Sequence, residues 1–128
     1  MSAPATGRAP VLVVDDDEDI RTSVADILAG QGYEVRTADD GDEALRLIGQ
    51  EPFAVLVLDV RMPRRDGLAV LDALEHPPPV VLMSAHSLDR EAKGRLRPKV
   101  STFLKKPFPP RLLIEQIAGI VSGAGGTQ

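Results

Sequence analysis

The chain has 128 residues, of which 43 % are hydrophobic and 27 % are charged, a balance typical of one soluble globular domain. It has no cysteine, which excludes disulfides, thiolate nucleophiles and sulfur-based zinc sites, and its two histidines exclude a histidine-rich metal cage. A formal net charge of −4 argues against direct binding to nucleic acid. No stretch approaches the ~20 apolar residues of a membrane span. We therefore expect a cytoplasmic protein that binds neither nucleic acid nor membranes directly.

Apolar runs alternate with helical patterns along the chain, which is typical of a parallel sheet covered by helices. Five segments have the composition of strands: Val11 to Val14, Tyr33 to Ala38, Phe53 to Leu58, Val80 to Met83, and Thr102 to Leu104. The first, third and fourth are nearly unbroken aliphatic runs, which suits strands that are buried on both faces. We therefore predict an α/β fold with these three strands at the centre of the sheet.

Apolar residues recur at helical spacing between the predicted strands. The first and last of these helices carry the sets Ile20, Val24, Ile27, Leu28 and Leu113, Ile117, Ile120, Val121. A second helix is predicted after Gly41 through Ile48, and a third opens at Gly67 and includes Leu74. Gly32 and Gly49 are predicted to end the first two helices, because glycine tolerates the left-handed backbone of a helix terminus.

The segment from Leu88 to Leu96 is the weakest predicted helix. Its apolar stripe is thin, and Gly94 costs about 1 kcal/mol relative to alanine in a helix interior. We expect it to be the least stable element of the domain. The domain is expected to span residues 11–121, between a flexible segment at 1–10 and a flexible tail at 122–128.

Polar residues follow four of the predicted strands at the point where each strand ends. They are Asp15, Asp16 and Asp17 after the first strand, Asp59 after the third, Ser84 after the fourth, and Lys105 and Lys106 after the fifth. Because the carboxyl ends of parallel strands lie at one edge of the sheet, these side chains should share a crevice. Carboxylates in a crevice repel one another unless a cation or a lysine offsets their charge. Mg²⁺ prefers one or two carboxylates, waters and a phosphate oxygen, which fits Asp16 and Asp59.

Four sequence motifs stand in order at these strand ends. They are VLVVDD at Val11 to Asp16, LDVRMPRRDG at Leu58 to Gly67, LMSAH at Leu82 to His86, and KPF at Lys106 to Phe108. Together they resemble the receiver domain of two-component response regulators, and the resemblance covers Val11 to about Val121. It implies a flavodoxin-like fold of five βα units, with a doubly wound five-stranded parallel sheet in a three-layer sandwich. It also implies a stand-alone receiver of the chemotaxis-regulator kind.

The resemblance implies a phosphoryl acceptor and a metal site. Asp59 would accept a phosphoryl group from a phosphohistidine of a sensor histidine kinase or a phosphotransfer protein. Mg²⁺ would be bound by Asp16 and Asp59 directly and by Asp15 directly or through water. Arg61 would offer the metal its backbone carbonyl. Such a receiver has no separate enzymatic activity and only assists its own phosphorylation and dephosphorylation.

The resemblance also implies how the phosphoryl group is held and sensed. The Ser84 hydroxyl and the Lys106 ammonium would hold the other phosphoryl oxygens, since phosphoryl transfer depends mainly on positioning and charge neutralisation. A cis bond between Lys106 and Pro107 would aim the ammonium into the crevice. Ser84 and Phe103 would form the conformational switch, with the ring turning inward when the hydroxyl moves towards phosphate.

Two further predictions concern the lifetime of the phosphoryl group and the output surface. Arg61 and His86 stand at the family's positions beside the path of the hydrolytic water, and both are large donors that can shield the phosphorus. We expect slow loss of phosphate. A downstream protein should dock on the region from Leu88 to Lys106. Its charged residues from Asp89 to Lys99 carry a net charge of +3, which predicts an acidic patch on the partner.

Other functions are compatible with parts of the sequence. A pseudo-receiver would use the same fold as an unphosphorylated interaction module. A phosphatase of the haloacid dehalogenase type would use Asp15 and Asp17 as its acidic pair, but Asp19 stands where that family has a hydroxyl residue. A calcium loop would require glycine at Ile20. Asp17 or Asp19 can also serve simply as a cap of the first helix.

Overall fold

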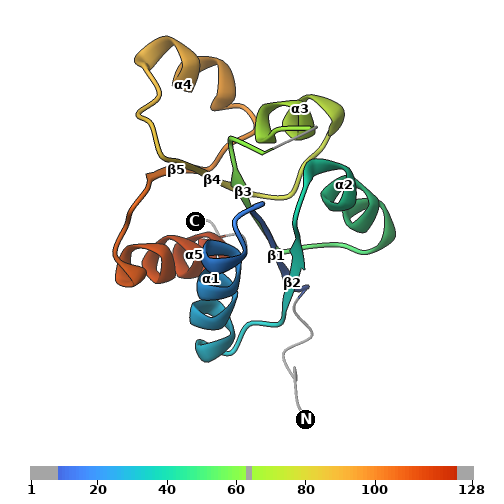
Figure 1. Ribbon diagram of the computed structural model, residues 1–128, viewed down its shortest axis with the longest axis vertical. Coiled ribbons are helices and arrows are strands. Elements are labelled where there is room, and N and C mark those ends of the chain that lie inside the picture. Colours follow the sequence, from blue (N-terminus) through green and yellow to red (C-terminus); the bar gives the residue numbers. More distant parts are fainter. Residues whose placement is uncertain (1–8, 63–64, 124–128) are drawn as a thin grey trace.

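A parallel β-sheet forms the middle layer of the protein, with helices on both of its faces (Figure 1). The computed structural model describes residues 9–62 and 65–123. Its strands are β1 (Val11–Val14), β2 (Val35–Ala38), β3 (Val55–Asp59), β4 (Val80–Ser84) and β5 (Thr102–Lys105). Its helices are α1 (Glu18–Gly30), α2 (Gly41–Gln50), α3 (Gly67–Ala73), α4 (Arg90–Leu96) and α5 (Pro110–Gly123). The expected flavodoxin-like α/β fold with a doubly wound five-stranded sheet is confirmed.

The order of the strands places a crevice beside β1 and β3. The sheet runs β2-β1-β3-β4-β5, and all neighbouring strands are parallel. β2 therefore lies on one side of β1, and the later strands lie on the other. Where the winding direction changes, an open α/β sheet leaves a ligand crevice at the carboxyl ends of its strands. Val14 lies beside Leu58 in the register, so the residues that follow them, Asp15 and Asp59, are neighbours.

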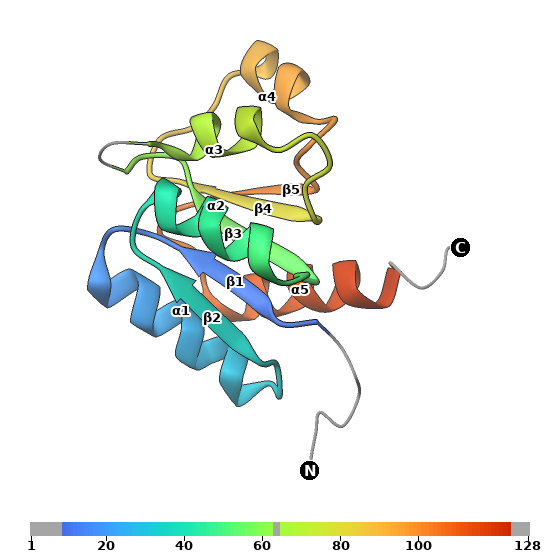
Figure 2. The same cartoon turned by 90° about the vertical axis from the view of Figure 1, so that its right-hand side faces the viewer.

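The central strands β1, β3 and β4 are buried along their whole length, as their aliphatic composition predicts. Successive side chains of a strand point to opposite faces of the sheet, so these strands build two cores. The core under α2 and α3 includes Leu12, Leu56 and Leu82. The core under α1 and α5 includes Val13, Val57, Leu113 and Ile117 (Figure 2).

Aspartates cap the amino ends of four helices. The side chains of Asp17, Asp40, Asp66 and Asp89 accept hydrogen bonds from backbone N–H groups in the first turns of α1, α2, α3 and α4. A carboxylate at this position satisfies donors that have no partner within the helix and also complements the helix dipole. The caps set where each helix begins. For this reason α4 begins at Arg90, after Asp89, and not at Leu88 as predicted.

Some predicted ends of helices and strands are wrong by a few residues. Gly32, with φ 94°, ends the turn after α1 as predicted, but α2 continues past Gly49 because the Glu51 N–H still donates to the Leu47 carbonyl. α3 ends at Ala73, and Leu74 adopts an extended backbone. β2 begins at Val35 and β3 at Val55, each two residues later than expected. β2 begins later because the Tyr33 N–H still donates to the Leu28 carbonyl of α1.

The two ends of the described chain are more ordered than the domain limits implied. Pro10 is buried, and its carbonyl accepts a hydrogen bond from the Ala54 N–H, so it belongs to the folded domain. Helix α5 runs through Gly123, so Ser122 and Gly123 are helical and not part of a tail. Residues 1–8 and 124–128 of the two expected flexible segments lie outside the described residues. None of the described helices combines the length and the apolar character that crossing a membrane requires.

Candidate functional site

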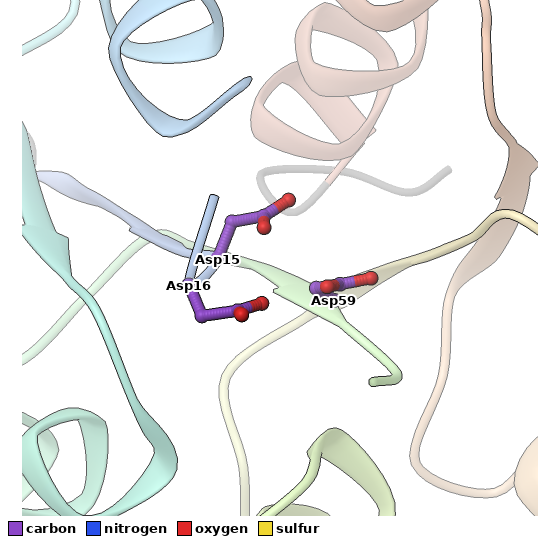
Figure 3. A group of neighbouring side chains, drawn as sticks. All are labelled: Asp15, Asp16 and Asp59. Carbon is purple, nitrogen blue, oxygen red and sulfur yellow. The ribbon is translucent and has the colours of Figure 1, made fainter. Parts of the chain in front are cut away.

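Three carboxylates converge at the carboxyl ends of β1 and β3. Asp15 and Asp16 follow β1, Asp59 ends β3, and Figure 3 shows the three side chains grouped near the ends of these two strands. One oxygen from each carboxylate lies within 4.8 Å of the others. Asp15 and Asp59 are buried, with relative exposures of 0 % and 5 %, whereas Asp16 is exposed. The cluster therefore has a closed side within the sheet and an open side towards solvent.

Asp15 is fixed in place by groups from three directions. One of its carboxylate oxygens accepts a hydrogen bond of 2.9 Å from the Asp17 N–H. The other accepts a hydrogen bond of 2.9 Å from the Lys106 ammonium. Its backbone carbonyl accepts a hydrogen bond of 2.9 Å from the Arg21 guanidinium of α1. Both carboxylate oxygens therefore have protein partners, and the acid most open to an incoming ligand is Asp16.

Lys106 joins β5 to the two buried carboxylates. Its Nζ lies 2.9 Å from Oδ2 of Asp15 and 3.2 Å from Oδ1 of Asp59. The expected cis bond to Pro107 is present. Burial alone would lower the pKa of the Lys106 ammonium, but its hydrogen bonds to these carboxylates and their negative charges outweigh burial and raise the pKa. The lysine is therefore held in its charged form.

Asp59 lies in an environment that opposes its ionisation. Burial and the negative charge of Asp15 raise the pKa of Asp59, although Lys106 and a hydrogen bond from the Arg61 backbone N–H act in the opposite direction. The three carboxylates carry three formal negative charges, and Lys106 supplies one positive charge. A divalent cation would neutralise the excess, and oxygen donors of this kind are the ligands that Mg²⁺ prefers. The donor set therefore fits Mg²⁺.

Comparison with known proteins identifies the family that carries this arrangement. Residues 11–118 match the response regulator receiver domain family. This chain is a member of that family. It is 37 % identical over 120 residues to the transcriptional regulatory protein PrrA of Mycobacterium tuberculosis, covering 91 % of this chain and 52 % of PrrA. It is 33 % identical over 113 residues to the transcriptional regulatory protein CpxR of Escherichia coli, covering 87 % of this chain and 48 % of CpxR.

The receiver also resembles solved structures over almost the whole of their chains. The chemotaxis protein CheY4 of Vibrio cholerae matches with a TM-score of 0.81 at 32 % identity, covering 89 % of this chain and 99 % of CheY4. The receiver domain of the Francisella response regulator 1452 matches with a TM-score of 0.84 at 31 % identity, covering 91 % and 99 % of the two chains. By contrast, the chain spans about half the length of PrrA and CpxR.

The Ser84 hydroxyl is engaged within its own loop. Ser84 ends β4 next to the acidic cluster and is buried, with 7 % exposure. Its hydroxyl donates to the His86 carbonyl at 2.6 Å and accepts from the His86 N–H at 3.1 Å. Within the described residues no hydrogen bond joins this hydroxyl to Asp59. To donate a hydrogen bond to a phosphoryl oxygen on Asp59, the hydroxyl would have to leave the His86 carbonyl.

The remaining predicted site residues lie around the rim of the cluster. The side chains of Arg61 and His86 are both exposed, one after β3 and the other after β4. The Arg61 N–H bonds to Asp59, whereas the role of its carbonyl as a metal ligand stays a prediction. Phe103 lies on β5 beside Leu82 of β4 and is half-buried.

Sequence reasoning missed two features of the site. A Cβ atom added at Gly67 would overlap the Asp59 carbonyl oxygen, so only glycine lets α3 begin this close to the acceptor strand. The Phe103 ring faces two cations of the α4 segment, with Lys93 Nζ 5.7 Å and Arg97 Cζ 5.8 Å from its centroid. The four-residue spacing of Lys93 and Arg97 was a visible signal that both lie on one helix face.

Proposed function

We propose that this receiver accepts a phosphoryl group on Asp59 from a phosphohistidine, with Mg²⁺ as cofactor, and then presents an altered docking surface to a downstream protein. The observation that carries the proposal is the position of the Asp59 carboxylate, between the Lys106 ammonium on one side and the exposed carboxylate of Asp16 on the other. Membership of the receiver family supports the role of phosphoryl acceptor.

The transfer is a substitution at phosphorus. A carboxylate oxygen of Asp59 forms the new bond to phosphorus, the bond to the histidine nitrogen breaks, and its electron pair stays on the imidazole. Bound Mg²⁺ would neutralise phosphoryl oxygens and the charge of the cluster. Lys106 already contacts the reacting carboxylate and would also meet a phosphoryl oxygen. Its charge favours the ionised, nucleophilic form of Asp59 against the burial that opposes it.

The phosphoryl group would be sensed through Ser84. Contact with it would draw the hydroxyl away from the His86 backbone and open space beside Phe103. The ring would then turn inward, and the surface between Leu88 and Lys106 would change shape and become the docking face for a downstream protein with an acidic patch. This is a shift between conformations that both exist before phosphorylation.

Arg61 and His86 would set the lifetime of the phosphoryl group. Their side chains are exposed, Arg61 after β3 and His86 after the neighbouring strand β4. From there they can cover the line along which water attacks phosphorus, and the guanidinium can hold a phosphoryl oxygen. We expect no catalysis beyond the receiver's own phosphorylation and dephosphorylation, and we place both in the cytoplasm.

A pseudo-receiver is the alternative function, and the site does not favour it. The acceptor, the acidic pair and the lysine that phosphorylation uses are all present in contact with one another. A module that only binds partners would gain nothing from placing Asp59 where burial and the negative charge of Asp15 raise its pKa.

Phosphorylation of the purified protein tests the proposal. With acetyl phosphate and Mg²⁺, intact-mass spectrometry should show one added phosphoryl group on the wild type and none on Asp59→Asn. Asp72→Asn is the matched control, because Asp72 lies exposed on α3 away from the cluster, and it should be phosphorylated like the wild type. Phosphate on Asp59→Asn would move the acceptor to another residue. A wild type without phosphate would favour the pseudo-receiver.

A further inference from the structure

Helix α4 is held to the rest of the receiver by few apolar contacts. None of its residues is buried, whereas each of the other four helices buries at least two. In Figures 1 and 2 it lies at the outer end of the molecule, beyond α3. Leu88 and Leu96, at its two ends, are only partly buried against the core. Contacts other than a fully buried apolar face therefore contribute to its position.

One such contact joins α4 to β5 through an aromatic ring. Lys93 lies on α4 and Arg97 is its C-terminal cap, four residues apart and on the same face. The Phe103 ring meets both, with its centroid 5.7 Å from Lys93 Nζ and 5.8 Å from Arg97 Cζ. Both distances lie within the range of about 6 Å in which a ring face attracts a cation. Two like charges at this spacing repel each other and destabilise a helix, and the attraction of each cation to the ring opposes that destabilisation.

A cavity next to Phe103 offers its ring a second position. A partly open cavity of about 180 Å³ is lined by the ring together with residues of β4, β5, the loop after β4 and α4, among them Ser84, His86, Leu88 and Lys93. A cavity of about 150 Å³ is enough to hold a benzene molecule, so this space can receive a phenyl ring. A ring that turned into it would approach Ser84 and move away from Arg97, which does not line the cavity.

We propose that Lys93 and Arg97 form a cationic clamp that holds Phe103 in its half-exposed position and thereby keeps α4 against β5. The clamp biases the receiver towards the conformation it has without phosphate. This regulatory role rests on the proposed switch through Ser84 and Phe103, whereas the attachment of α4 does not. Lys93 and Arg97 act through the ring and are positioning residues. Each contact should favour the clamped state by about two- to fivefold, the range of cation–π contacts at exposed sites.

Methionine variants test the clamp, because methionine removes the positive charge while keeping an unbranched side chain of similar helix propensity. The variants are Lys93→Met, Arg97→Met and the double substitution. Arg95→Met is the matched control, since Arg95 lies on the same helix and neither cation–π contact includes it. Arg97→Lys should restore the wild-type behaviour, because it restores the cation.

Two measurements are made on each variant. Without a phosphoryl analogue, hydrogen exchange of the α4 amides should be about two- to fivefold faster in each single variant than in Arg95→Met, and faster still in the double variant. With Mg²⁺ present, calorimetry should show that the clamp variants bind beryllofluoride more tightly by a similar factor, because the ring is already released. A general loss of structure would accelerate exchange without tightening that binding.

The outcomes separate the clamp from the proposed function. Exchange and affinity equal to those of Arg95→Met would overturn the clamp, and so would weaker binding of beryllofluoride by the clamp variants. If the wild type itself fails to bind beryllofluoride, the proposed function is contradicted, while faster exchange of α4 in the clamp variants would still support the attachment of α4.

Discussion

Helices α5 and α4 cover the same sheet and are attached to it in different ways. α5 has 14 residues and buries Leu113 and Ile117 in the core that it shares with α1. α4 has 7 residues, buries none of them, and is attached through half-buried leucines and the Phe103 contact. Local opening is least costly where few apolar contacts must break. The difference separates a region that maintains the fold from a region that is free to respond.

The functional site spans both regions. Asp15 and Asp59 stand at the ends of β1 and β3, whereas Ser84 and Lys106 stand at the ends of β4 and β5, the two strands that α4 connects. A phosphoryl group on Asp59 that bonds to Ser84 and Lys106 would therefore pull on the weakly attached side from the strongly attached one. The energy of these contacts would therefore change the conformation of the α4 side, which is held by fewer apolar contacts than the α5 side.

Truncating a leucine in each helix should expose the contrast most strongly. Leu113→Ala in α5 should cost about 2–5 kcal/mol of unfolding free energy, because Leu113 is fully buried and its removal leaves a cavity. Leu96→Ala in α4 should cost about 1 kcal/mol, since a half-exposed side chain loses less buried apolar area. Urea denaturation followed by circular dichroism gives both values. Equal losses would show that α4 is attached as firmly as α5.

Magnesium should stabilise the central side of the site. Without a divalent cation the three carboxylates repel, so Mg²⁺ at a hundredfold excess over its Kd should add about 2.7 kcal/mol to the unfolding free energy. Asp16→Ala should abolish that gain, because Asp16 is the open ligand. Asp39→Ala, at an exposed aspartate after β2, should keep it. An equal Mg²⁺-dependent shift in Tm for wild type and Asp16→Ala would place the metal elsewhere.

The charge of Asp59 should have a smaller effect on the free energy of unfolding. Because burial and Asp15 raise the pKa of Asp59, the folded protein binds this proton more tightly than the unfolded chain does. Its contribution to stability should therefore fall as pH rises from the ordinary carboxyl range through the folded pKa. Without divalent cations, the free energy of unfolding of Asp59→Asn should be larger than that of the wild type at neutral pH. The two free energies should become equal at about pH 3. A variant less stable than wild type at neutral pH contradicts this charge balance.

The smallest effect should come from strengthening α4 alone. A Cβ atom at Gly94 would meet nothing within 4 Å, so Gly94→Ala should stabilise the helix by up to about 1 kcal/mol through its backbone propensity. Hydrogen exchange of the α4 amides should slow accordingly. Gly119→Ala in α5, also in open space, is the control and should leave α4 exchange unchanged. Unaltered α4 exchange in Gly94→Ala would mean that helix propensity does not limit this region.

The fold and the acidic cluster were predictable because their signals are local in sequence. The aliphatic run of β1 requires burial on both faces, and Asp15, Asp16 and Asp59 follow strands whose carboxyl ends must share an edge. The end of α2 was not predictable from Gly49, because a glycine ends a helix only where the chain leaves the helical hydrogen bonds, and here it does not.

Contacts that depend on how elements pack were beyond the sequence. The self-contained hydrogen bonds of Ser84 depend on the path of the loop after β4. The contact of Phe103 with Lys93 and Arg97 depends on where a helix without a buried face comes to rest. The thin apolar stripe of Leu88 to Leu96 did predict that this helix would be the weakest, and it is the only described helix with no buried residue.

Hydrogen exchange of the wild type with and without beryllofluoride, at one Mg²⁺ concentration, tests the central claim most directly. The claim is that a phosphoryl group on Asp59 acts on the side of α4 and leaves the side of α5 in place. The exchange rates of amides in α4 and β5 should change when beryllofluoride binds, while those of α5 should stay the same. Bound beryllofluoride with unchanged α4 and β5 exchange, or with equal changes in α5, would contradict the account.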